Sequence, residues 1–316
     1  MQAITENYMF ISFVGSLTTL VVCMVAGYIG RKVGVLSDTI NAGMSTLLVK
    51  ITLPCMVFVS MMRPFSATLL LESLATLVIS AIVYLSGYVF GLLLARLMGA
   101  AEDEKRVWQF ALVFANVGYM GFPIIQAIYG AEGLIYTTMA NVAFNMLAFS
   151  LGIYLFKRNA SADIKTNLRT ILLNPALVAT YLGFIFFITG IRLPENVQDG
   201  VSLIGGMTVP LSMLLVGAIL AKSKPADLVS DPRVLPVIFL RLLGIPLVTF
   251  FILRLFIPNP IMLEVIVILA AMPVAALTVI FAEQYKGNTA VASKLVALSS
   301  ILCLLTIPII SLLLQN

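Results

Sequence analysis

The feature that most constrains this chain is a succession of apolar runs, each roughly 20 residues long and bounded by charged or turn-forming residues. As a helix, a run of that length spans the hydrocarbon core of a bilayer. With 61% hydrophobic and 10% charged residues, the chain cannot be an ordinary soluble domain. We predict an all-α integral membrane protein. The ten predicted transmembrane helices cover residues 9–30, 40–62, 68–95, 107–129, 133–156, 171–190, 200–221, 234–256, 262–284 and 289–314.

The loops between these runs are short, and most Lys and Arg residues fall in alternate loops. Only Arg63, Arg192 and Arg254 fall on the other side. The positive-inside rule therefore predicts a multi-pass protein of the cell (cytoplasmic) membrane with both termini extracytoplasmic. The net charge of +5 is explained by these loops, so the lipid bilayer is the expected surrounding and no nucleic acid is expected as a partner.

The two halves of the chain resemble each other. Leu47–Pro54 lines up with Leu203–Pro210, and Pro123 has a counterpart at Pro273. Each half has five spans, and an odd number reverses direction on repetition, so the halves must be inverted. This predicts a first repeat at 1–156, a cytoplasmic connecting loop at 157–170 and a second, inverted repeat at 171–316.

Two of the apolar runs carry signals that break a helix. In Phe114–Ile124, Pro123 lacks an N–H, while Gly118 and Gly121 permit backbone conformations that a helix does not favour. Pro273, within Ala270–Ala276, marks a second break in the opposite half. Backbone groups freed inside a membrane are tolerated only in protein or in a water-filled cavity, so we predict that helices 4 and 9 are broken and cross.

Several residues near these breaks have more than one interpretation. Asn116 could satisfy freed backbone groups, donate to a substrate carboxylate, or do both. Pro54 and Pro210 could kink their helices or line the site. The small-residue patterns Ala26-xxx-Gly30 and Gly87-xxx-Gly91 are typical of helix-packing surfaces.

Ionisable groups inside a membrane are costly and usually functional. Lys50 lies near mid-depth of its span and Glu72 about one turn into the next, whereas Arg241 and Lys294 lie within snorkelling distance of a surface. The chain has no histidine, which excludes imidazole metal sites and histidine catalysis. An integral-membrane enzyme would need a cluster of Asp, Glu, Ser or Cys at one interface. The sequence offers none, so neither catalysis nor a cofactor is expected.

The chain resembles the auxin efflux carrier family, which includes plant auxin exporters and bacterial malate and malonate permeases. The motifs that carry the resemblance cover almost the whole chain. They are Val49-Lys-Ile-Thr-Leu-Pro54; Asn116 through Pro123 and on to Ala127-Ile-Tyr-Gly130; Asn174-Pro175; Thr208-Val-Pro210; and Met272-Pro273 followed by Phe281-Ala-Glu-Gln-Tyr285. The short loop between spans 5 and 6 is more similar to the bacterial branch than to the plant exporters.

The resemblance implies a scaffold of spans 1, 2, 6 and 7, a transport part of spans 3–5 and 8–10, and an elevator-type alternating-access cycle. It further implies a homodimer and a small organic anion whose carboxylate binds at the crossover of spans 4 and 9. The candidate substrate-binding residues are Thr52, Asn116, Gly118, Tyr119, Gly121, Pro123, Thr208, Met272, Pro273 and Ala275. Lys50, Glu72 and Asn145 match a coupling cluster of the plant exporters.

Three alternatives stay open. Lys50 and Glu72 could form an ion pair that only holds spans 2 and 3 together. The carrier could be sodium-coupled, as bile-acid transporters are, or the chain could be a membrane sensor that transports nothing.

Overall fold

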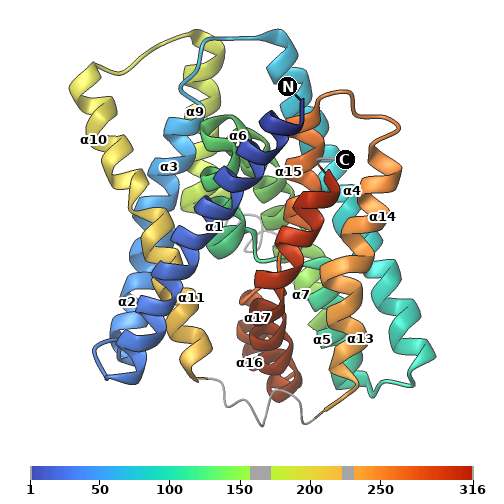
Figure 1. Cartoon of the computed structure of the whole chain (residues 1–316). Helices are drawn as coiled ribbons and strands as arrows, with labels where there is room; N and C mark the ends of the chain where they lie inside the picture. The colour runs from blue at the N-terminus through green and yellow to red at the C-terminus, as the bar shows by residue number, and fades with distance from the viewer. Residues whose placement is uncertain (1, 157–171, 223–230, 315–316) are drawn as a thin grey trace. The chain divides into compact units, whose positions relative to one another are not determined.

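The computed structural model describes residues 2–156, 172–222 and 231–314 (Figure 1). Within these ranges the regular elements are helices, and Ala115 and Val274 form an isolated β-bridge. Six helical segments are long and apolar enough to cross a membrane, and the shorter helices α9 (Pro175–Thr189) and α15 (Pro260–Ala270) are apolar as well. An all-helical, multi-pass membrane protein is thus confirmed. The predicted connecting loop 157–170 lies outside the described residues.

The chain forms two compact units, each assembled from both halves of the sequence. Unit 1 comprises residues 1–75, 118–139 and 168–222, and unit 2 comprises residues 76–117, 140–167 and 223–316. Helices α4 (Ala67–Leu97) and α6 (Phe122–Leu147) contribute to both units. Unit 1 therefore contains the four spans that the resemblance assigns to a scaffold, together with the start of α4 and part of α6.

In unit 1, the two halves of the chain pack against each other along the lengths of their helices. α1 contacts α11, and α2 and α3 run alongside α11 and α10 (Figure 1). The close approach of α1 and α11 requires Gly27 and Gly217, because a Cβ at either position would overlap the backbone of the facing helix. Gly30 instead faces Leu36. The residue ranges of these unit 1 helices are α1 (Gln2–Lys32), α2 (Asp38–Leu47), α3 (Leu53–Ser60), α10 (Glu195–Gly206) and α11 (Thr208–Lys222).

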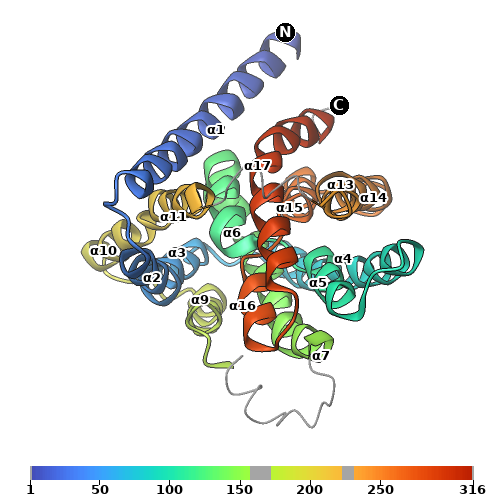
Figure 2. The ribbon, with the colours of Figure 1, turned by 90° about the horizontal axis from the view of Figure 1, so that it is seen from below.

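In unit 2, α16 and α17 from the second half of the chain lie beside α5 from the first half (Figure 2). α4 approaches α5 at Gly87 and Gly91, where a Cβ would meet the backbone of α5, so the predicted packing role of this pair is confirmed. The remaining helices are α5 (Glu102–Val113), α7 (Ile153–Phe156), α13 (Val234–Phe239), α14 (Ile245–Leu253), α16 (Leu277–Gln284) and α17 (Thr289–Leu314).

Three prolines inside apolar helices each follow a π-helical turn. A proline ring clashes with the carbonyl four residues earlier and cannot donate to it, and a widened turn gives that carbonyl room. Each proline lies two residues after the end of its turn, which points to this common cause. The pairs are η1 (Leu48–Thr52) with Pro54, η2 (Val117–Gly121) with Pro123, and η4 (Leu240–Gly244) with Pro246. A fourth turn, η3 (Ala148–Gly152), has no such proline.

Candidate functional site

The first interruption lies between α5 and η2. α5 ends at Val113, and Phe114 is extended, with φ −103° and ψ 110°. Helical structure resumes with η2 at Val117 and continues into α6. The predicted break is confirmed, but it lies at residues 114–116. Pro123 lies beyond the break, in α6 directly after the widened turn η2.

The second interruption lies between α15, which ends at Ala270, and α16, which begins at Leu277. The two extended segments pair within unit 2. Asn116 N–H donates to Pro273 O at 2.8 Å, and Ala275 N–H donates to Phe114 O at 3.0 Å. These bonds flank the antiparallel bridge of Ala115 and Val274. The two broken helices therefore meet at their breaks, as a crossover.

Side chains from other helices hold the crossover in place. Ser299 of α17 accepts a hydrogen bond from Val274 N–H at 3.0 Å. The Phe114 ring packs against Phe110, Phe144 and Tyr84, with centroid separations of 4.5, 5.5 and 6.5 Å. A backbone that leaves the helical conformation inside a protein must find its partners locally, and here it does.

Arg241, in η4, is the residue that the sequence interpretation placed wrongly. Its side chain does not reach a surface: the residue is 1% exposed. Its guanidinium donates through Nη1 to Leu112 O at 2.8 Å, through Nη2 to Ala270 O at 2.9 Å and through Nε to Met272 O at 3.1 Å. These carbonyls belong to the C-terminal ends of α5 and α15 and to the break that follows α15. Arg241 therefore binds the C-terminal ends of both α5 and α15 through hydrogen bonds.

A sequence signal for Arg241 did exist. The apolar run 234–256 contains no acidic residue that could pair with an arginine eight residues into it. A buried guanidinium without a carboxylate needs several carbonyl acceptors, and interrupted helices provide carbonyls without helical partners. On that basis, the arginine in the run 234–256 could have been predicted to bind carbonyls at the helix breaks.

The crossover has two electrically different sides. Helices α5 and α15 end there with their carbonyls, which carry partial negative charge and are taken up by Arg241. The helical segment that opens with η2 and helix α16 begin there with their N–H groups, which carry partial positive charge. Thr278, in the first turn of α16, is fully buried, and its Oγ1 has no hydrogen-bond partner among the described residues. Asn116 is also buried.

The candidate residues in unit 1 occupy three local settings. Gly118, Tyr119 and Gly121 all lie in η2, and the Tyr119 hydroxyl is 2.6 Å from the hydroxyl of Ser45 on α2. Thr52 is buried in η1 and donates to Leu48 O at 3.4 Å. Thr208 is buried at the start of α11, and its Oγ1 lacks a partner within the described ranges.

The three coupling candidates are divided between the two units. In unit 1, Lys50 lies in η1 and is exposed, and the Glu72 carboxylate accepts a hydrogen bond of 2.6 Å from the buried Tyr136 hydroxyl. In unit 2, the buried Asn145 amide donates to Asn141 O at 2.8 Å. Tyr136 was not anticipated from the sequence, because 64 residues separate it from Glu72.

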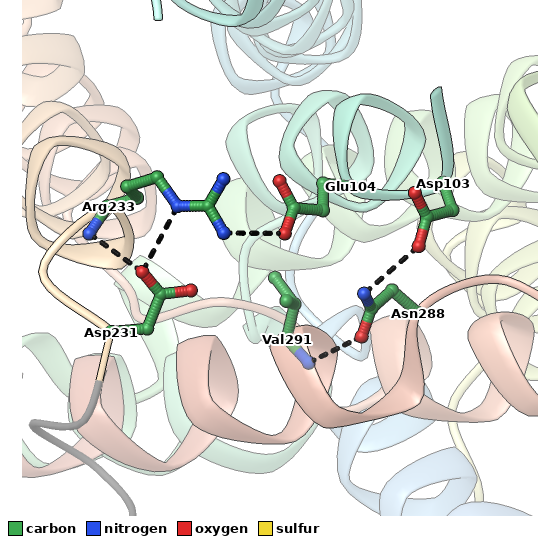
Figure 3. A network of polar contacts seen from close by, with 6 residues as sticks. All are labelled: Asp103, Glu104, Asp231, Arg233, Asn288 and Val291. Carbon is green, nitrogen blue, oxygen red and sulfur yellow. Dashed lines mark hydrogen bonds and ion pairs between the residues drawn. The ribbon is translucent and has the colours of Figure 1, made fainter. Parts of the chain in front are cut away.

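A polar network lies at the N-terminal end of α5 (Figure 3). Arg233 pairs with Glu104 at 3.0 Å and with Asp231 at 3.3 Å, and Asn288 donates to Asp103 at 3.0 Å. The hydrogen bond to Asp231 and the charge of Glu104 raise the pKa of Arg233. The three acidic residues in the first turn of α5, Glu102, Asp103 and Glu104, also suit the positive end of that helix. The network connects α5, the segment before α13 and the start of α17.

Comparison with known proteins shows similarity to transporters over nearly the whole chain. An uncharacterized transporter of Methanothermobacter thermautotrophicus is 28% identical over 307 residues, covering 94% of this chain and 98% of the relative. The uncharacterized transporter YfdV of Escherichia coli is 24% identical over 314 residues, covering 94% of this chain and 96% of the relative. A family described as membrane transport protein matches residues 12–311. This match over nearly the whole chain shows that the protein belongs to the membrane transport protein family, the auxin efflux carrier family that its motifs resemble.

Proposed function

We propose that this membrane transport protein is a secondary transporter of small organic anions, either mono- or dicarboxylates such as malate or malonate or auxin-like acids. The observation that carries the proposal is the crossover in unit 2. There Arg241 occupies the carbonyl ends of two half-helices, while the N-terminal ends of the following segments remain to attract an anion. A carboxylate with its two oxygens is the small group that such a site binds best.

Within this proposal, three polar groups of unit 2 bind the substrate carboxylate. The Asn116 amide and the N–H groups at the start of α16 donate to it. The buried Thr278 hydroxyl supports this role, because a buried hydroxyl without a protein partner costs stability unless a ligand or water satisfies it. Met272 and Pro273 shape the break, and Ala275 is held by its bond to Phe114.

The remaining substrate candidates belong to unit 1. Gly118, Tyr119, Gly121 and Pro123 lie in η2 and at the start of α6, and they stay substrate-binding candidates together with Thr52 and Thr208. The Thr208 hydroxyl supports this assignment, because it is buried without a described partner.

We also propose elevator-type transport by a homodimer, with unit 1 supplying most of the scaffold. The division of the chain supports this, because unit 1 contains spans 1, 2, 6 and 7 and unit 2 contains spans 8–10.

We propose that both termini are extracytoplasmic. Single cysteines near Arg63 and Arg192, in a background without native cysteines, should react with an impermeant maleimide on intact cells. Labelling of a cysteine placed at Lys222 instead would show that the protein has the opposite orientation in the membrane.

Coupling to protons is proposed to involve Lys50, Glu72 and Asn145. Glu72 is the group best placed to exchange a proton, because its carboxylate is half-buried and held by the Tyr136 hydroxyl. Glu72→Gln should abolish the dependence of uptake on an imposed pH gradient. Full retention of that dependence would show that Glu72 has a structural role only.

The function is tested by uptake into proteoliposomes. The purified protein is offered a panel of labelled carboxylates, with pH and Na⁺ gradients imposed separately. Asn116→Ala should lower carboxylate affinity at least tenfold, whereas the matched variant Asn174→Ala removes the N-cap of α9 and should leave affinity unchanged. The proposal would be refuted if none of the carboxylates in the panel showed saturable uptake. Uptake that depends on the Na⁺ gradient alone would favour the sodium-coupled alternative.

A further inference from the structure

Arg241 has an unusual environment for a charged residue. It is almost fully buried, and all three of its guanidinium nitrogens donate to backbone carbonyls. Glu104 is the other charged residue buried within the described part of unit 2, and Arg233 pairs with it. The contacts of Arg241 are thus carbonyl dipoles of two helix ends, where a carboxylate would be the usual partner.

The charges at the crossover balance when the helix ends are counted. A helix C-terminus carries roughly half a negative elementary charge, so α5 and α15 together bring about one. The single positive charge of Arg241 matches that total. The helical segment that starts at Val117 and helix α16 bring roughly half a positive charge each, which again makes about one. No charge in the protein is needed to balance this second total, because a substrate can supply it.

We propose that Arg241 is a positioning residue that neutralises the converging C-termini of α5 and α15, and so sets the charge accepted at the crossover to a single carboxylate. This inference rests on the proposed function and deepens it. A dicarboxylate would present one carboxylate to the crossover and keep the other outside it. Without Arg241, the exposed carbonyl ends would cancel the attraction of the N-termini, and the site would lose its preference for anions.

The proposal is tested by a thiol that reports the local potential without any substrate. Ala276 is the N-cap of α16 and is half-buried. Ala276→Cys is introduced after Cys23, Cys55 and Cys303 are replaced by alanine. A thiol at a helix N-terminus ionises below its ordinary pKa of about 8.5. The ultraviolet absorbance of the thiolate, followed against pH in detergent, measures this ionisation.

With Arg241 present, the thiol should titrate below pH 8.5. Arg241→Gln, which keeps a donor but removes the charge, should lower the thiolate-to-thiol ratio at neutral pH about tenfold. Arg241→Lys keeps the charge with fewer hydrogen bonds and should restore most of the ionisation. Ser299→Ala, which removes the neighbouring bond to Val274 without a change of charge, controls for loosened packing.

Three outcomes would overturn the proposal. The first is an Ala276→Cys thiol that titrates at or above its ordinary pKa while Arg241 is present. This measurement needs no Arg241 variant, so it holds even if Arg241→Gln fails to fold. Equal shifts in the Arg241→Gln and Arg241→Lys variants, or an equal shift in Ser299→Ala, would show that packing is responsible. A charge-dependent thiol in a protein that takes up no carboxylate would refute the proposed function while leaving the role of Arg241 intact.

Discussion

Gly87→Ala tests whether the crossover depends on the close approach of α4 to α5. A Cβ at residue 87 would overlap Leu112 O and lie 2.9 Å from the Leu112 carbonyl carbon and 3.0 Å from Val113 Cα. These are backbone atoms, which cannot rotate away as a flexible side chain would. Leu112 O is also the acceptor for Arg241 Nη1. The added methyl group must therefore move either α4 or the end of α5 that Arg241 holds.

The expected loss of stability follows from three contributions. Overpacking by one methyl group costs about 1–3 kcal/mol. Weakening a charge-assisted hydrogen bond costs a further 1.5–3 kcal/mol or so. The better helix propensity of alanine returns about 1 kcal/mol. The free energy of unfolding should thus fall by roughly 1.5–5 kcal/mol, and carboxylate affinity should fall with it.

The chain contains a reporter for this experiment. Its single tryptophan, Trp108, lies in α5 one turn before Leu112 and is 1% exposed. Its fluorescence during thermal denaturation in detergent follows the loss of packing around α5. Gly43→Ala is the matched control, because nothing lies within 4 Å of a Cβ in that position of α2. A Gly87→Ala midpoint that equals or exceeds that of the Gly43→Ala variant would refute the reasoning.

Three further predictions concern buried or partly buried polar groups. Thr278→Val should weaken carboxylate binding while Thr278→Ser retains it, measured by uptake affinity; equal affinities would remove the hydroxyl from the site. Tyr136→Phe deletes the donor to Glu72 and should lower stability by about 1–3 kcal/mol, read from the thermal midpoint, and an unchanged midpoint would argue against that bond. Arg233→Gln, which leaves Glu104 buried without a cation, should also lower the midpoint and do so less at high salt, whereas a salt-independent effect would point to lost packing.

The sequence by itself determined the class of protein and the two apolar runs in which a helix breaks. Span length and apolarity are local properties, so an all-helical protein with apolar, membrane-spanning segments was predictable, whereas the structure has six helical segments of span length. The breaks were predictable because glycine and proline act on the backbone of their own neighbourhood. Their detail was not, since the first break lies at residues 114–116, several residues before Pro123. The roles of Lys50, Glu72 and Asn145 in coupling remain predictions.

Only the tertiary structure decided what completes the crossover. Arg241 donates to carbonyls that are 29, 31 and 129 residues away in the chain. Every residue has a carbonyl, so the sequence can indicate that Arg241 needs acceptors but not which carbonyls supply them, and the arginine was wrongly predicted to reach a surface. The composition of the two units also depends on which helices pack together, as at Gly87. Packing between helices distant in sequence is set by their combined surfaces, and a local pattern therefore cannot specify it.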